Sequence, residues 1–497
     1  MTDFFSRRAI LLGAASALAD AALTPAAMAD APQTALRPVA RPAPSVRPAM
    51  ADLIAAANLG GIVGCVVADA RTGMILEQSN GAAILPPASV AKAVTALYAL
   101  DLLGPGYRFS TRLIGTGPVV NGVLEGDLVL AGGGDPVLST DHLATMAERL
   151  KQAGIQSVRG AFQVWGGALP YVQSIDSQQQ EHLGYNPAVS GLNLNFNRVY
   201  FEWARSSATY IVTMDARTDK LRPVVTTARM TVVDRDLPVY TYTDADGVDD
   251  WTVARTALGD GGSRWLPVRR PALYAGDVFR SMVRAQGIDL PAATEADSLP
   301  AGAELVRLLS DPLDVLIRDM LKYSTNLTAE AIGLTATAAR GVHVRNLTQS
   351  ARSMAQWARR TMGVGAVFVD HSGLGDASDM SASEMVRVLV AAVPAGQLRG
   401  MMKDIVLVDS QGEALPEPPA MVVAKTGTLN FVSALAGYIR TPGGADMAFA
   451  IFSADPSSRT LARQSQAEVP NGARDWNQRA KGLQQELLQR WAVVYAG

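Results

Sequence analysis

A short stretch around Ser89 constrains the fold of this chain more than any other. Pro86 and Pro87 hold the backbone extended just before it, because a proline disfavours helical geometry in the preceding residue. An unbroken run of good helix formers then continues to Leu103. Ser89 is therefore predicted to lie at the first turn of a buried helix, where it shares one face with Lys92, three positions later.

The spacing of Ser89 and Lys92 has a chemical use. A serine hydroxyl becomes an effective nucleophile when a base takes its proton, and a lysine can be that base if burial and the positive end of a helix keep its amine neutral. The commoner meaning of Ser-x-x-Lys is a helix-capping serine beside a solvated surface lysine. The chain has seven lysines and a single Ser-x-x-Lys, and no charged residue stands between Lys92 and Asp101. The motif alone leaves both interpretations open.

The first 29 residues are predicted to be a signal peptide rather than part of the fold. Arg7 and Arg8 precede a short apolar run, and residues 27–29 form the small-x-small pattern of a signal peptidase site. This pattern predicts twin-arginine export to a bacterial periplasm, with cleavage after Ala29. The alternative is an uncleaved N-terminal anchor, although the apolar run is short for a membrane span. Residues 30–48 carry five prolines and are predicted to be an extended arm.

Composition excludes several classes of function. The formal net charge of −2 gives no indication of a nucleic-acid partner. The single cysteine, Cys65, lies in an apolar run, so we expect a buried core residue and no internal disulfide. Glycines 132–134 follow a predicted strand, but no Gly-Lys-Ser/Thr comes after them, which favours a tight turn over a phosphate-binding loop. The chain has no His-x-x-x-His pair or cysteine cluster, so no metal and no cofactor is expected.

Changes in pattern along the chain predict one domain built from two separated segments. Residues 49–103 are predicted to hold a short helix, a two-stranded hairpin and the Ser89 helix. Residues 104–300 consist mainly of short strands and turns, which indicates a β-rich insertion. After Ala303 the chain is expected to be helical again, and residues 301–497 complete the first domain. Three consecutive strands are predicted near its end and suggest an antiparallel sheet: 421–428, 432–440 and 447–453.

Two further motifs accompany Ser89-x-x-Lys92. Residues 324–326 read Ser-Thr-Asn in a loop between two predicted helices, and residues 425–427 read Lys-Thr-Gly in a predicted strand. Each motif is weak alone, but their order, separation and settings are together highly specific. They form the active-site signature of penicillin-binding proteins and serine β-lactamases, and the chain resembles that superfamily.

Within the superfamily, the chain resembles the D-alanyl-D-alanine carboxypeptidase/endopeptidase family of low-molecular-mass penicillin-binding proteins (peptidase S13 type). The resemblance covers residues 57–455 and includes the long insertion between the first two motifs. It implies an α+β fold, in which a transpeptidase-like domain with an antiparallel sheet flanked by helices is interrupted by a mainly β insertion of two small modules beside the active-site cleft. Four segments carry the resemblance besides the motifs: 126–136, 190–193, 370–374 and 433–438.

The resemblance implies a serine D,D-peptidase that acts on peptidoglycan stem peptides through an acyl-enzyme and that β-lactams inhibit. Its target is the terminal D-alanine, as a carboxypeptidase, or a D-alanyl-diaminopimelate cross-link, as an endopeptidase. In this mechanism Ser89 is the nucleophile and Lys92 its base, and Ser324 and Lys425 relay a proton to the leaving D-alanine. Backbone N–H groups of Ser89 and Thr428 receive the oxyanion. The implied substrate-binding residues are Asn326, Thr426, Gly427 and Thr428.

Two residues depart from the family pattern. Thr325 stands where the family commonly has aspartate, with little effect expected because the chemistry is assigned to its neighbours. His371 stands where a small residue is usual, so a local change in the cleft is expected. Residues 166–185 of the insertion are expected to line the side of the cleft that receives the substrate's side chain.

Three alternatives to this function are considered. A serine β-lactamase is the nearest, and the long insertion argues against it by resemblance. A cell-wall binding protein on the same fold would lack turnover, although every motif residue is present. A serine hydrolase with a histidine base would require a histidine near the serine, and the chain has no Gly-x-Ser-x-Gly motif. The histidines are His142, His182, His343 and His371. The oligomeric state stays open.

Overall fold

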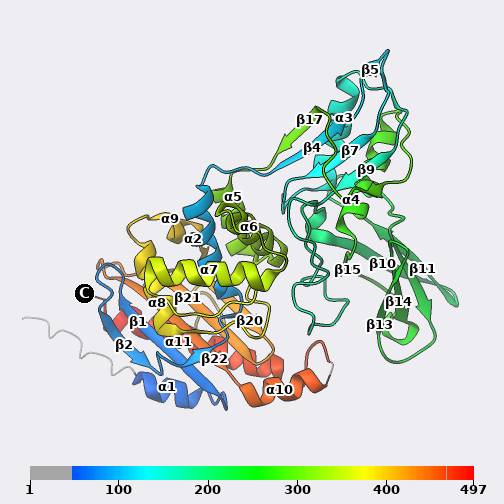
Figure 1. Ribbon diagram of the computed structural model, residues 1–497. Coiled ribbons are helices and arrows are strands. Elements are labelled where there is room, and N and C mark those ends of the chain that lie inside the picture. Colours follow the sequence, from blue (N-terminus) through cyan, green and yellow to red (C-terminus); the bar gives the residue numbers. More distant parts are fainter. Residues whose placement is uncertain (1–47, 466, 497) are drawn as a thin grey trace, which may run out of the picture. The chain divides into compact units, whose positions relative to one another are not determined.

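The computed structural model describes residues 48–465 and 467–496, so the predicted signal peptide and nearly all of the predicted arm lie outside the described residues. Segments from near both ends of the described chain meet in one six-stranded antiparallel sheet (Figure 1). The predicted hairpin and the three predicted consecutive strands are confirmed as members of this sheet. In spatial order its strands are β19 (Lys403–Asp404), β20 (Met421–Leu429), β21 (Val432–Arg440), β22 (Asp446–Ala454), β1 (Ile62–Asp69) and β2 (Ile75–Ser79).

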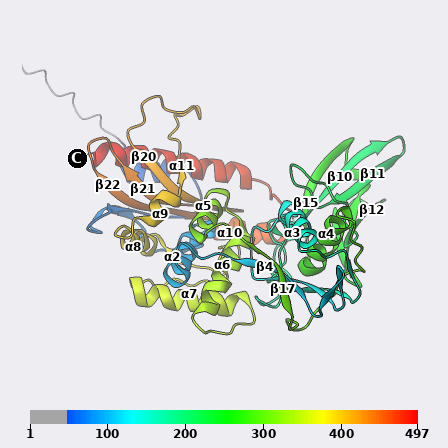
Figure 2. The same ribbon diagram turned by 90° about the horizontal axis from the view of Figure 1, so that it is seen from above.

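Helices cover both faces of this sheet. The side chains of Cys65 and Val67 on β1 pack in one apolar cluster with helix α11 (Ala473–Val494). Val66 and Ala68 pack in another cluster, with α2 (Ala91–Leu103) and α8 (Ala382–Ala392). Because successive side chains of a strand point to opposite faces, this alternation requires a helical layer on each side. Figure 2 shows α11 on one side of the sheet and α2 and α8 on the other. Cys65 is fully buried, as predicted.

Helix α2 lies inside the helical layer and is buried along most of its length. Its alanines at 91, 93, 96 and 99 are fully buried, and their small side chains let the neighbouring helices approach closely. Tyr98 packs edge-on against Trp357. The helices packed against α2 are α5 (Leu313–Tyr323), α6 (Asn326–Ala339), α7 (Leu347–Met362) and α9 (Gln397–Met401).

The strands between residues 110 and 309 form sheets of their own. The largest has five strands, and α3 (Thr140–Gln152) and α4 (Pro271–Ala285) contribute to the apolar cluster around it. In spatial order the five strands are β16 (Thr294–Glu295), β9 (Phe162–Trp165), β7 (Leu128–Gly132), β4 (Ser110–Gly115) and β17 (Ala303–Leu309). One three-stranded sheet is β11 (Thr209–Asp215), β10 (Arg198–Ser206) and β15 (Gly261–Pro267); another is β12 (Ala228–Val233), β14 (Val248–Ala254) and β13 (Tyr240–Ala245).

The remaining elements are short. Strands β3 (Ile84–Leu85) and β18 (Met380–Ser381) pair with each other, and helix α1 (Met50–Ala56) precedes the six-stranded sheet. Helix α10 (Pro456–Gln464) follows β22. A small sheet consists of β5 (Val119–Val120), β6 (Val123–Leu124) and β8 (Ser157–Val158).

Residues 303–309 contradict the expectation that the chain is helical directly after Ala303. They form β17, which pairs antiparallel with β4, and helix begins again only at Leu313. The segment contains good helix formers, but pairing with the edge of the five-stranded sheet and burial of Val306 outweigh that local preference. The fold class is α+β, and a mainly β segment lies between the two parts of the chain that form the six-stranded sheet, as predicted. No helix within the described residues is long and apolar enough to cross a membrane.

Candidate active site

Ser89 lies where the sequence predicts it, in the turn that begins helix α2. Residues Ala88–Val90 form one 3₁₀ turn that leads directly into the helix. Ala88 adopts a left-handed backbone conformation with φ of 46°, which is uncommon for a residue with a side chain. Such a conformation is held by its surroundings. Here Gly427 of β20 lies against the turn: an ideal Cβ atom built on Gly427 would lie 3.0 Å from the backbone nitrogen of Ser89. A side chain at position 427 would therefore push β20 away from Ser89.

Lys92 is completely buried and points at Ser89. Its Nζ atom donates to Ser89 Oγ at 3.0 Å, to Asn326 Oδ1 at 2.7 Å and to the carbonyl of Ser372 at 2.7 Å. Burial lowers the pKa of Lys92 to about 8, against the opposing charges of Asp370 and Glu330. The interpretation of Lys92 as a solvated surface lysine is therefore wrong.

The second and third motifs meet at a hydrogen bond between Ser324 and Lys425. Ser324 ends helix α5 in a left-handed conformation, so its side chain projects from the loop before α6. Lys425 Nζ donates to Ser324 Oγ at 2.9 Å and to the Thr426 carbonyl at 2.6 Å. Burial lowers the pKa of Lys425 strongly, and the charges of Lys92 and Lys403 lower it further.

Asn326, the first residue of α6, joins the motifs to the loop 166–190. Its Oδ1 atom accepts the bond from Lys92, and its Nδ2 atom donates to the carbonyl of Tyr185 at 2.9 Å. Thr426 and Thr428 are exposed on β20, whereas Lys425 and Gly427, which alternate with them, are buried, as strand alternation requires. The structure thus brings all eight predicted site residues to one place, around the first turn of α2.

The side chain of His371, where a small residue is usual, lies in the core. Its imidazole is fully buried, and its Nε2 atom lies 2.7 Å from Ser350 Oγ of α7. An ideal Cβ at Gly333 of α6 would lie 2.2 Å from the imidazole ring, so the glycine provides the space that the histidine fills. Burial lowers the pKa of His371 to about 3, which keeps the ring neutral. Its described polar contacts are with Ser350, Met354, Glu330 and Thr95, so they do not support a role as base for Ser89.

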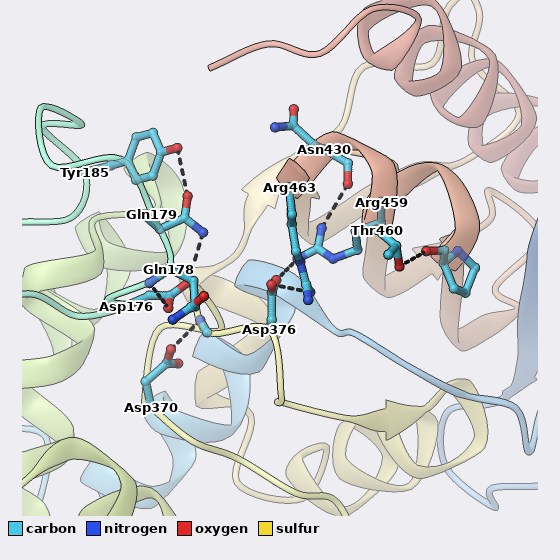
Figure 3. Close-up of polar contacts among 12 residues, drawn as sticks. Asp176, Gln178, Gln179, Tyr185, Asp370, Asp376, Asn430, Arg459, Thr460 and Arg463 are labelled. Carbon is cyan, nitrogen blue, oxygen red and sulfur yellow. Dashed lines mark hydrogen bonds and ion pairs between the residues drawn. The ribbon is translucent and has the colours of Figure 1, made fainter. Parts of the chain in front are cut away.

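Three polar residues that the sequence analysis missed, Asp376, Arg459 and Arg463, lie opposite the loop 166–190. Figure 3 shows Asp176, Gln179 and Tyr185 of this loop on one side. On the other side, Asp376 forms ion pairs with Arg459 and Arg463 of α10. Gln179 Nε2 donates to Asp176 at 3.0 Å, and Tyr185 donates to Gln179 at 3.4 Å. These residues come from three distant parts of the chain. The only sequence signal was the helical i, i+4 spacing of the two arginines.

A model of the D-Ala-D-Ala carboxypeptidase 3 (S13) family matches residues 46–471. The chain is 26% identical over 473 residues to the D-alanyl-D-alanine carboxypeptidase of Actinomadura sp. (strain R39), a match that covers 84% of each chain. It is 25% identical to D-alanyl-D-alanine carboxypeptidase DacB of Haemophilus influenzae, over 79% of this chain and 85% of the relative.

A solved structure has the same fold. Penicillin binding protein 4 (dacB) from Haemophilus influenzae matches with a TM-score of 0.68 and 19% sequence identity, covering 88% of this chain and 99% of that chain. The structure of that protein complexed with a novel β-lactam gives the same TM-score.

Proposed function

The chain belongs to the D-Ala-D-Ala carboxypeptidase 3 (S13) family, and from this membership we propose that it is a serine D,D-peptidase of peptidoglycan. Its substrates are stem peptides that end in D-alanyl-D-alanine, from which it releases the terminal D-alanine. Cross-links between D-alanine and diaminopimelate are a second substrate. One observation carries the proposal: the Nζ atom of the buried Lys92 lies 3.0 Å from Oγ of Ser89.

In the proposed acylation step, Ser89 Oγ attacks the carbonyl carbon of the penultimate D-alanine. The proton of Oγ passes to the neutral amine of Lys92 as the new C–O bond forms. The carbonyl oxygen becomes an oxyanion, which accepts hydrogen bonds from the backbone N–H groups of Ser89 and Thr428. A neutral lysine is a reasonable base here because burial lowers its pKa to about 8.

The tetrahedral intermediate then collapses, and its C–N bond breaks. The leaving D-alanine nitrogen takes a proton through Ser324 and Lys425, a relay supported by their 2.9 Å hydrogen bond. Asn326 orients the substrate amide. Lys425, Thr426 and Thr428 bind the terminal carboxylate of the substrate, and Gly427 lets their strand approach the Ser89 turn. Water hydrolyses the acyl-enzyme ester and restores the Ser89 hydroxyl.

A β-lactam acylates Ser89 by the same steps and is released slowly, which makes it an inhibitor. The relative solved with a β-lactam is consistent with this proposal, since it shares the fold. Slow release also distinguishes the proposed peptidase from a β-lactamase, which would hydrolyse the same ester quickly.

We propose that residues 166–185 contact and recognise the side chain of the substrate. Support comes from the hydrogen bond that Asn326 makes to the carbonyl of Tyr185, which brings the end of this loop to the motif residues. Exchanging Asp176 or Gln179 for alanine should then change the relative rates on peptides that differ in the third residue. Unchanged relative rates on both carboxypeptidase and endopeptidase substrates would remove this part of the proposal.

Export to the periplasm through the twin-arginine pathway is proposed from residues 1–29 alone. Replacing Arg7 and Arg8 together by lysine should leave the protein in the cytoplasm. Secretion that survives this double substitution would contradict the proposed pathway.

The proposed activity is tested by the release of D-alanine from a stem pentapeptide that ends in D-alanyl-D-alanine. The chain without residues 1–29 should release one D-alanine per peptide, and Ser89→Ala should abolish this release. Ser206→Ala is the matched control, because Ser206 is exposed and lies on β10 outside the motifs. Release by Ser89→Ala, or no release by the unaltered chain, would contradict the proposal.

A further inference from the structure

Two buried carboxylates hold the loop of residues 370–375. Glu330 of α6 uses both oxygens: Oε1 accepts the Ser372 N–H at 2.8 Å and Oε2 accepts the His371 N–H at 3.0 Å. Asp370 also uses both oxygens, which accept the N–H groups of Gly373 at 2.6 Å and of Gly375 at 2.5 Å. A carboxylate that accepts two backbone bonds has little freedom to move, and it fixes the peptide units it binds.

This loop carries one of the three groups that bind Lys92. The carbonyl of Ser372 accepts a 2.7 Å hydrogen bond from Lys92 Nζ, and Ser372 is also the residue whose N–H is bound by Glu330. The next residue, Gly373, touches the Ser89 turn so closely that an ideal Cβ there would lie 1.9 Å from the Ala88 carbonyl oxygen. The position of Ser372 therefore sets where the Lys92 amine lies relative to Ser89.

Charge as well as geometry connects Glu330 to Lys92. Both side chains are fully buried, and Asp370 is 1% exposed. The charged or titratable groups that face Lys92 are Glu330 on α6, Asp370 on the loop and Lys425 on β20, and the buried His371 lies beside Glu330. The charge of Glu330 raises the pKa of Lys92, whereas burial lowers it. Burial and the charge of Asp370 raise the pKa of Glu330 to about 8, close to that of Lys92, so Glu330 is ionised in the pH range where Lys92 is neutral and can act as the base. In that range a positive charge that forms on Lys92 would be stabilised by the carboxylate of Glu330 in a site that little water reaches.

We propose that Glu330 is a positioning residue for acylation, which holds the Ser372 carbonyl against Lys92 and stabilises the ammonium formed when Lys92 takes the proton of Ser89. In that step the O–H bond of Ser89 breaks, an N–H bond forms on Lys92, and the electron pair left on Oγ forms the bond to the carbonyl carbon. The ammonium then passes its proton through Lys425 and Ser324 to the leaving nitrogen, so neither Lys92 nor Glu330 undergoes a net change. This inference rests on the proposed acyl-enzyme function.

The test measures the rate at which benzylpenicillin acylates the chain, by intact-protein mass spectrometry, from about pH 5 to about pH 10. Glu330→Gln keeps the size of the side chain but removes its charge and one of its two acceptor oxygens. The rate at high pH should fall about tenfold, because the ammonium loses a stabilising charge. On the acid side of the profile, which we call the acid limb, the rate rises with pH. The midpoint of this rise should move down by about one pH unit, because Lys92 then loses its proton more easily.

Glu384→Gln is the matched control. Glu384 is another buried glutamate whose two oxygens each accept a backbone N–H, those of Gly365 and Ser381 at 2.9 Å, and its described bonds involve none of the motif residues. This variant should lose stability but keep the acid limb of the unaltered chain. Glu330→Asp keeps the charge on a shorter side chain. Its midpoint should therefore lie close to that of the unaltered chain, whereas its acylation rate should stay below that of the unaltered chain.

The experiment distinguishes failure of the inference about Glu330 from failure of the proposed function. A lower rate for Glu330→Gln with an unchanged midpoint would show a purely structural role and overturn the inference. If Glu330→Gln does not fold, Asp370→Asn removes the other carboxylate charge near Lys92, and an unchanged midpoint in that variant would overturn the inference equally. No acylation of the unaltered chain would overturn the proposed function itself, and the inference with it.

Discussion

An ideal Cβ atom at Gly333 would lie 2.2 Å from the imidazole ring of His371. The glycine on α6 and the histidine in the 370–375 loop therefore form a matched pair, in which the missing side chain of one makes room for the ring of the other. The ring is fixed by Ser350, whose Oγ lies 2.7 Å from its Nε2 atom, so it has little freedom to move aside.

Gly333→Ala should therefore lower the free energy of unfolding by about 2–3 kcal/mol, through overpacking. Gly482 provides the control, because an added Cβ there meets nothing within 4 Å and the residue is exposed on α11. Gly482→Ala should instead raise the free energy of unfolding by about 0.5–1 kcal/mol. Both values come from urea unfolding curves. Equal effects of the two substitutions would contradict the matched-pair account.

The double variant Gly333→Ala, His371→Ser tests the same contact from the other side. Removing the ring also removes the clash, so the double variant should lose about 1–2 kcal/mol less stability than the sum of the two single variants. Simple additivity would show that the two residues do not constrain each other.

Cys65 should resist alkylation in the folded protein. Its thiol is fully buried on β1, and burial raises its pKa to about 12, so little reactive thiolate exists at pH values well below that. Iodoacetamide should label the native chain at least about a hundredfold more slowly than the chain unfolded in urea. Because Cys65 is the single cysteine, Cys65→Ala should take up no label in either state. Labelling of the native chain at the unfolded rate would contradict the placement of Cys65 in the core.

The rate of acylation should rise with pH through the pKa of Lys92. The base must be neutral to accept the Ser89 proton, and the neutral form predominates above the lysine's pKa of about 8. Below that pH the rate should fall about tenfold per unit, because the protonated fraction grows. A rate that is constant between about pH 6 and about pH 9 would contradict Lys92 as the base.

Lys92→Arg tests the same role by substitution. A guanidinium keeps its proton at any pH at which the protein is folded, so it cannot act as a base. The acylation rate should fall by about 10²–10⁴-fold, and the variant should have no acid limb near pH 8. Thermal unfolding of the variant is the control, since a misfolded protein would also lose activity. Acylation at an undiminished rate in the folded variant would exclude Lys92 as the base.

The parts of the site that depend on local pattern were predictable from sequence. Ser89 and Lys92 lie one helical turn apart, so the helix formers that follow Pro87 were sufficient to place them on one face. The strand that carries Lys425 was predictable from its apolar residues and its two neighbouring strands. The family resemblance, confirmed by the family model over residues 46–471, then related these motifs to one another.

The parts that depend on contacts between distant segments were not predictable. The carbonyl that binds Lys92 belongs to Ser372, 280 positions further along the chain. Glu330 looks in the sequence like an ordinary polar residue of a helix, and only the fold shows that it is buried beneath the site. The space left by Gly333 allows the ring of His371 to enter the core, and this contact joins segments that the sequence does not show to be neighbours. The strand at 303–309 was missed because pairing with β4 outweighs its local preference.

The central claim is that Ser89 is an acylated nucleophile with slow deacylation, and intact-protein mass spectrometry tests it most directly. The chain without residues 1–29 would be incubated with benzylpenicillin beside Ser89→Ala. The account predicts one stable penicilloyl group per chain, absent from Ser89→Ala. Rapid hydrolysis of benzylpenicillin without a lasting adduct would contradict this account and indicate a β-lactamase, and no reaction at all would indicate a non-catalytic binding protein.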